Sequence, residues 1–202
     1  MRYLAFVVAM LAGATAAFGQ IDAFTVSGGY SRLHTGRTGG LFYDNNGGYI
    51  DGDVLFPVRG APFPLLLGGG ISGSGYNEDE FVPVSGEFFD ERFRSDLGLL
   101  SFEGRAAIPI PLGFLPRGFF VMPRIGAGLL VNDYSIDSIA TGFTEDHTGA
   151  AFEIRPAVQV GYSWGTGSVG AEVAYMSAWG DFGKLGATAW ELRAGVFVRF
   201  RF

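Results

Sequence analysis

Three Glu-x-Arg triplets are the most prominent chemical feature of this 202-residue chain. They are Glu103-Gly104-Arg105, Glu153-Ile154-Arg155 and Glu191-Leu192-Arg193. Residues two apart in an extended strand lie on the same face, so each triplet places a carboxylate beside a guanidinium. Arginine suits such pairs because its planar fork bonds two carboxylates and stays charged. The triplets therefore indicate ion-pair chemistry on one face of several strands.

Further charged residues follow the same alternation and share this less apolar face. The predicted network of salt bridges contains ten residues: Asp51, Asp53, Glu103, Arg105, Arg124, Glu153, Arg155, Glu172, Glu191 and Arg193. Arg199 and Arg201 bring the face to six acids and six arginines, although the whole chain has a net charge of −6. An unpaired buried charge costs several kcal/mol, whereas a solvated face needs no balance. The neutral tally predicts an enclosed face; the alternative is a soluble barrel with these charges in water.

Eight stretches of alternating apolar and polar residues position these charges. They span residues 24–33, 49–58, 65–76, 100–108, 119–132, 151–164, 169–179 and 190–202. Period-two alternation is typical of β-strands. The residues around Leu97 to Leu99 are out of phase with the fourth stretch, and Pro123 and Pro156 remove ladder donors. A bulge or local break is expected at each of these places.

Composition and connector lengths together predict the architecture. Apolar residues make up 48% of the chain and glycine occurs 33 times, yet no apolar run after residue 19 is long enough for a membrane helix. The connectors after the second, fourth and sixth stretches are short, and the others are longer and more polar. Short periplasmic turns and long outer loops are typical of outer-membrane barrels. We predict an all-β, eight-stranded antiparallel up-and-down transmembrane β-barrel, with apolar side chains toward lipid.

The ends of the chain and its composition set further limits. Residues 1–19 combine Arg2, an apolar run and small residues, which predicts a secretory signal peptide rather than a membrane anchor, with residues 20–202 as the barrel domain. Without residues 1–19, 13 basic side chains face 20 acidic ones, which argues against nucleic acid as a partner. The absence of cysteine excludes disulfides and thiolate metal sites.

With this signal, these strands and a final strand ending in Phe202, the whole mature chain resembles small bacterial outer-membrane β-barrel proteins, the superfamily of OmpA-type transmembrane domains and OmpX-like barrels. The resemblance implies a bacterial outer-membrane location. It implies contact with outer-membrane lipid and lipopolysaccharide, and an assembly signal read by the barrel assembly machinery. The matching signal residues are Val196, Val198, Phe200 and Phe202. Unlike OmpA, this chain carries no peptidoglycan-binding domain, so cell-wall anchoring is not supported.

The expected function is structural or interactive, in a monomer with a charge-plugged lumen and no cofactor or metal. A narrow pore or a carrier for small hydrophobic solutes is the alternative. A lipid A-modifying enzyme is a weaker one, because neither His34 nor His147 belongs to the His-x-Ser pattern of the deacylases. The chain is therefore expected not to be an enzyme. Acidic residues 78–80, 90 and 91 lack the EF-hand spacing, and a solvated loop is expected there.

Overall fold

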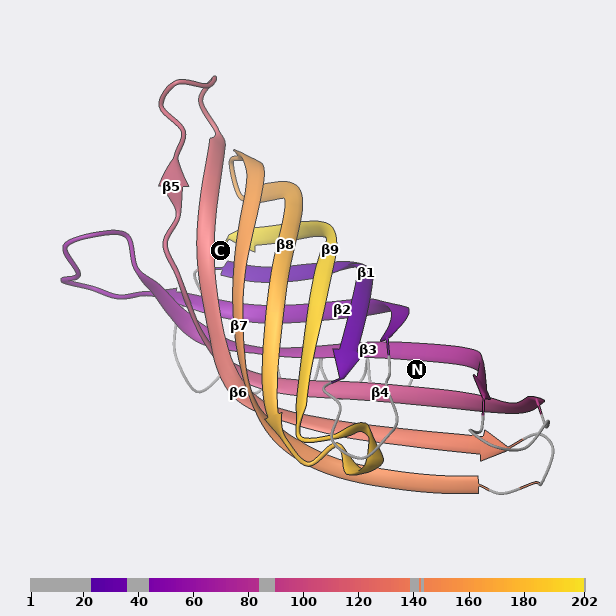
Figure 1. Ribbon diagram of the computed structural model, residues 1–202. Helices are drawn as coiled ribbons and strands as arrows, with labels where there is room; N and C mark the ends of the chain where they lie inside the picture. Colours follow the sequence, from indigo (N-terminus) through magenta and orange to yellow (C-terminus); the bar gives the residue numbers. More distant parts are fainter. Residues whose placement is uncertain (1–22, 36–43, 84–89, 139–141, 143, 202) are drawn as a thin grey trace.

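Nine strands form one closed antiparallel sheet in the computed structural model, which describes residues 23–35, 44–83, 90–138, 142 and 144–201. They are β1 (Ala23–Thr35), β2 (Asp44–Pro57), β3 (Leu66–Pro83), β4 (Asp90–Ala107), β5 (Ile110–Pro111), β6 (Phe119–Ser138), β7 (Thr144–Trp164), β8 (Gly167–Gly180) and β9 (Thr188–Arg201). Consecutive strands pair from β1 to β4 and from β5 to β9, β1 pairs with β9, and β4 pairs with β6. Eight strands thus close the barrel, and the two-residue β5 lies beside β6 (Figure 1). The predicted eight-stranded antiparallel barrel is confirmed.

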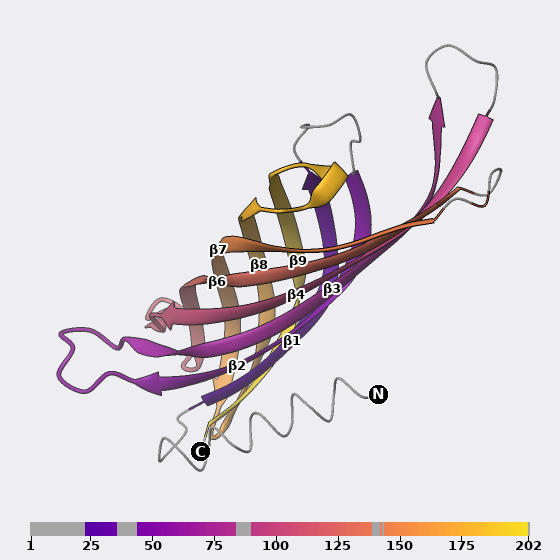
Figure 2. The ribbon, with the colours of Figure 1, turned by 90° about the horizontal axis from the view of Figure 1, so that it is seen from below.

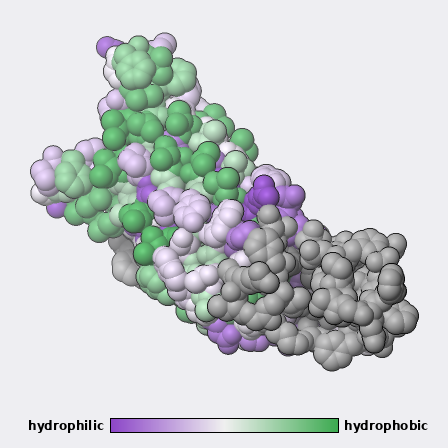
Figure 3. Space-filling model, in the orientation of Figure 1, coloured by the Kyte–Doolittle hydropathy of each residue, from purple (hydrophilic) through white to green (hydrophobic). Residues whose placement is uncertain are grey.

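The predicted division between two faces is visible along β9. Glu191, Arg193 and Phe197 are buried inside the barrel, while Leu192 and Val196 between them are exposed on its outside, Val196 at 65%. The register of β9 with β1 and β8 is unbroken, so the alternation is kept over the whole strand. The outer surface is accordingly rich in hydrophobic residues (Figure 3).

The bulge expected near Leu97 is wrong. Pairing of β4 with β3 and with β6 runs through Leu97 and Leu99 without a shift in register. Both leucines are inward and buried. The phase looked broken because the inner face itself becomes apolar toward the loop end of the barrel.

Each of the two prolines inside strands lies at an interruption of one ladder. The β7–β8 ladder has partners up to Ile154 and again from Ala157, in the same register, so Pro156 interrupts pairing without adding a residue. At Pro123 the β6–β7 ladder is continuous, and the pairing with β4 ends one residue beyond, at Arg124. Pairing on that side resumes in the same register at Val121, opposite Ile110 of β5, so this ladder is interrupted at Pro123. The expected local break is confirmed at both prolines.

Strands replace much of the two longest predicted loops. β3 continues to Pro83 against β4, and β6 continues to Ser138 against β7. These pairs extend past the neighbouring β2 and β8 (Figures 1 and 2). Tyr134 is inward and buried in this extension. No helix among the described residues is long and apolar enough to cross a membrane.

Residues 1–22 lie outside the described residues. The predicted signal peptide therefore stays a prediction.

Candidate functional site

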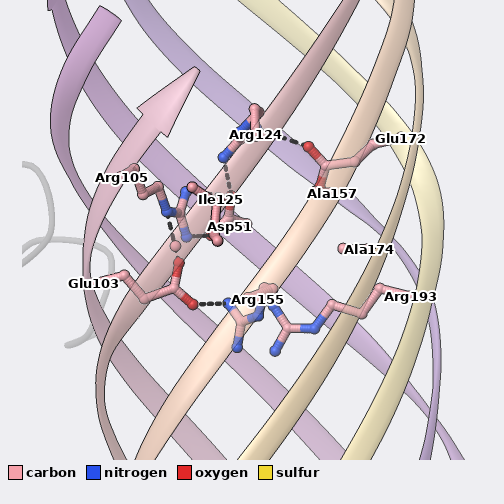
Figure 4. A pocket seen from close by; sticks show the side chains of 11 residues that line it. Asp51, Glu103, Arg105, Arg124, Ile125, Arg155, Ala157, Glu172, Ala174 and Arg193 are labelled. Atoms are coloured by element: carbon pink, nitrogen blue, oxygen red, sulfur yellow. Dashed lines mark hydrogen bonds and ion pairs between the residues drawn. The ribbon is translucent and has the colours of Figure 1, made fainter. Parts of the chain in front are cut away.

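The interior of the barrel between its two ends is the candidate site, and Arg105 on β4 lies at its centre. Its guanidinium contacts Asp51 Oδ1 at 2.5 Å and Asp53 Oδ2 at 3.3 Å, both on β2. Its Nε lies 2.8 Å from Glu103 Oε2 on its own strand. β3 lies between β2 and β4, and Gly70 of β3 leaves the space through which the arginine passes. Figure 4 shows Arg105 reaching across to Asp51.

Arg124 on β6 joins the opposite walls of the barrel. Its Nη2 lies 2.6 Å from Asp53 Oδ2 on β2, and its Nη1 lies 2.8 Å from Glu172 Oε2 on β8. Gln159 on β7 also donates to Glu172, at 2.5 Å. The two carboxylates and the cation thus connect β2, β6 and β8 through side chains alone.

Arg155 on β7, like Arg105 and Arg124, contacts carboxylates of two strands. Its Nη1 lies 2.6 Å from Glu103 Oε1, and its Nη2 lies 2.9 Å from Glu153 Oε2. It also donates to the hydroxyl oxygens of Ser72 at 2.7 Å and Ser101 at 3.0 Å. Since Glu103 also contacts Arg105, this carboxylate links the two arginines (Figure 4).

Glu191 and Arg193 on β9 form the third triplet pair, with Arg193 Nε 2.8 Å from Glu191 Oε1. Tyr76 on β3 donates its hydroxyl to the same oxygen. Arg193 donates to Ser72 and Ser74 of β3 at 3.0 and 3.2 Å. The structure therefore brings all ten of the predicted network residues into ion pairs inside the barrel, where each is buried.

Arg199 and Arg201, the other two arginines predicted on the inner face, differ in their burial. Arg199 is buried and donates to neutral groups: Thr25 Oγ1 at 3.0 Å, Gln159 Oε1 at 2.5 Å and the sulfur of Met122 at 3.2 Å. Arg201 is exposed at the end of β9, so its expected place inside is wrong. β9 ends at the rim of the barrel, so the side chain at position 201 is no longer enclosed although the alternation directs it inward. Five arginines thus face the six inner carboxylates.

Buried apolar side chains pack on both sides of the charged layer. One cluster, of Leu55, Leu66, Ala107, Phe120, Met122 and Phe197, lies toward the short turns. A larger cluster lies toward the loops and includes Leu33, Leu97, Leu130, Met176 and Phe182. Sequence reasoning did not single out these layers, although Phe197 and Met122 share the face of the arginines and the alternation could have identified them.

Little free space is left inside the charged layer. The cavity lined by Asp51, Glu103, Arg105, Arg124, Arg155 and Glu172 has a volume of about 10 Å³. A cavity needs about 10–15 Å³ on this measure to hold one water molecule. The side chains therefore fill this layer to within about one water.

The histidines lie toward the loop end and on different strands. His34 stacks on Trp190, with ring centroids 4.7 Å apart. His147 Nε2 lies 3.4 Å from Asp181 Oδ1, and its ring centroid is 5.2 Å from that of Tyr134. Among the residues described, no group of three or more His, Cys, Asp or Glu could hold a metal ion.

Three of the predicted assembly-signal residues lie on the outer face of β9. Val196, Val198 and Phe200 are exposed there, and Phe202 lies outside the described residues. The backbones of the acidic residues 78–80, 90 and 91 lie in β3 and β4.

Comparison with known proteins gives a likeness of fold. No family model and no curated protein matches the chain. Among solved structures, the attachment invasion locus protein Ail of Yersinia pestis aligns with a TM-score of 0.55 at 12% identity, over 89% of this chain and 99% of that one. The outer membrane protease OmpT of Escherichia coli aligns with 0.51 at 10%, over 91% and 97%. A major outer membrane protein of Thermus thermophilus aligns with 0.50 at 12%, over 89% and 99%. This chain therefore has the fold of the small bacterial outer-membrane β-barrel proteins.

Proposed function

We propose that the protein is an integral outer-membrane barrel whose lumen is closed by its own side chains. In this proposal it acts in membrane integrity or in surface contact through the loop end, and it neither conducts solutes nor catalyses a reaction. The observation that supports it most is the packing of the charged layer, where about 10 Å³ of free space is left. A path for ions would require the ion pairs of Arg105, Arg124 and Arg155 to separate.

The outer face supports the membrane location. Val173, Val196 and Leu129 are at least half exposed, and each of the eight strands that close the barrel carries an exposed hydrophobic side chain. Such a surface would be unfavourable in water. In lipid the same face matches the apolar band of outer-membrane barrels. We further propose lipopolysaccharide as a contact of the loop end, the barrel assembly machinery as the reader of the last strand, and a monomeric state.

Planar-bilayer recording tests the closed lumen. Folded protein, verified by its anomalous migration on a gel before boiling, is added to the bilayer, with a larger general porin as the positive control. We expect no stable conductance steps. Reproducible open single-channel steps that depend on the folded species would contradict the proposal and favour a narrow pore.

The fold also occurs in a protease, so the non-enzymatic part of the proposal needs its own test. Histidine is the usual general acid–base residue, and His147 beside Asp181 is the pair that could serve. Lipid A from cells that carry the wild type is compared with lipid A from cells that carry His34→Ala or His147→Ala. We expect identical acylation; a difference that depends on either histidine would favour an enzyme.

A further inference from the structure

Two connectors at the turn end of the barrel expose apolar side chains on ordered backbone. The β2–β3 connector spans residues 58–65 and the β4–β6 connector spans residues 108–118; we call them the turn arms. Phe63 is 48% exposed in the first, and Phe114 is 83% exposed in the second. Both turn arms appear as mainly hydrophobic projections that diverge from the barrel (Figures 1 and 3). The formation of a tight turn in water does not require exposed phenylalanine side chains, so turn formation alone does not explain them.

Hydrogen bonds hold the turn arms in these positions. Val58 N donates to Leu65 O at 2.9 Å across the base of the first arm. In the second, Leu112 N donates to Phe119 O at 3.0 Å, and Leu115 N donates to Leu112 O at 3.1 Å. Gly60 and Gly118 supply the positive φ angles of 82° and 108° that the arms require. The apolar side chains are therefore presented outward by fixed backbone.

The backbone composition of the arms suits a medium poor in water. Five prolines lie within them, at positions 62, 64, 109, 111 and 116. Proline has no amide N–H, so each one removes a donor that would otherwise need a partner. An unpaired backbone group is costly near hydrocarbon, and the five prolines leave these arms with five fewer N–H donors to pair.

Charge separates the turn end from the loop end. The turn arms contain Arg59 and Arg117 and no Asp or Glu, although the chain has 20 acidic residues. Both arginines are exposed. The strand extensions at the loop end, in contrast, carry exposed Asp96, Asp133 and Asp146. Each arm thus combines an exposed phenylalanine with an exposed cation.

We infer that the turn arms are a lipid-binding surface, with Phe63 and Phe114 in the interface of the periplasmic leaflet and Arg59 and Arg117 on the phosphates of anionic phospholipids. The inference rests on the proposed membrane location, with the short turns on the periplasmic side. Aromatic rings favour the membrane–water interface, and basic residues near an anionic surface are attracted to it. The occupant is therefore a lipid, and a periplasmic protein is the competing outcome.

Single cysteines test the position of the arms, because the chain has no cysteine of its own. Phe114→Cys is labelled with an environment-sensitive fluorophore in barrels folded into vesicles of four zwitterionic to one anionic phospholipid. Thr166→Cys, in the exposed β7–β8 turn at the same end, is the control. We expect emission at shorter wavelength for position 114 than for position 166. Equal, water-like emission at both positions would overturn the inference and leave the arm to a protein partner.

The arginines are tested by folding equilibria in vesicles with and without the anionic lipid. The anionic lipid should increase the folding equilibrium constant of the wild type. In Arg59→Gln and in Arg117→Gln this increase should be smaller by up to about fivefold, the ratio equivalent to ~1 kcal/mol per basic residue. Arg32→Gln removes one charge from the loop end and should keep that gain. Equal behaviour of all three variants would overturn the assignment of the headgroup contact. Failure of the wild type to fold into either kind of vesicle is a different result, because it would contradict the membrane location itself.

Discussion

Arg105 lies so close over Gly70 that a Cβ on this glycine would stand less than 3.0 Å from the guanidinium carbon. The glycine is therefore part of the ion-pair network, because it gives Arg105 the space to reach Asp51 at 2.5 Å.

Gly70→Ala is expected to destabilise the barrel. The new methyl group must displace a guanidinium that several carboxylates hold, and overpacking of this kind costs about 1–3 kcal/mol. Urea titration of the barrel in vesicles measures the free energy of unfolding. Gly52→Ala is the control, because a Cβ there comes no closer than 4.0 Å to the nearest atom, Thr25 O. Equal losses in the two variants would show that Gly70 makes no special space for Arg105.

Arg155→Ala should be more damaging. The substitution removes the ion-pair partner of Glu153, which is fully buried, and an uncompensated buried charge costs about 3–5 kcal/mol. The same titration, compared with Arg201→Ala at the exposed end of β9, checks it. An unchanged free energy of unfolding for Arg155→Ala would refute the importance of this pairing.

Tyr76→Phe isolates one hydrogen bond of the network. Tyr76 is fully buried and its hydroxyl donates to Glu191, so the loss leaves a buried carboxylate with one donor fewer. We expect a cost of about 1–3 kcal/mol. Tyr30→Phe is the matched control, because the Tyr30 hydroxyl donates to Asn46 on the exposed outer side, where water can replace it. The prediction fails if the two phenylalanine variants are equally stable.

The sequence predicts the barrel well because lipid and a closed interior impose one simple rule on every strand. Alternation places Glu191 and Arg193 on one face and Leu192 on the other without any knowledge of the neighbouring strands. The same parity assigned Asp51, Arg124 and Glu172 to a common interior, although they come from separate strands. Once the sheet closes, side chains on this face lie inside the barrel.

Partners and strand ends could not be predicted in this way. The choice of Asp53 for Arg124 depends on the stagger between β2 and β6, which alternation does not encode. Residues such as Asp133 were expected in a loop because the segment is polar, but the strands continue past the barrel, where both faces can be polar. Arg201 was misplaced because parity holds only as far as the lumen extends.

A cysteine scan along β9, read by a quencher confined to the lipid phase, tests the central claim most directly. Labels at Ala194, Val196 and Val198 should be quenched strongly, and a label at Phe197 between them should be protected. This alternation would place the apolar face in lipid and the arginine face inside the cylinder. Strong quenching at position 197 with protection at 196 and 198 would contradict the account.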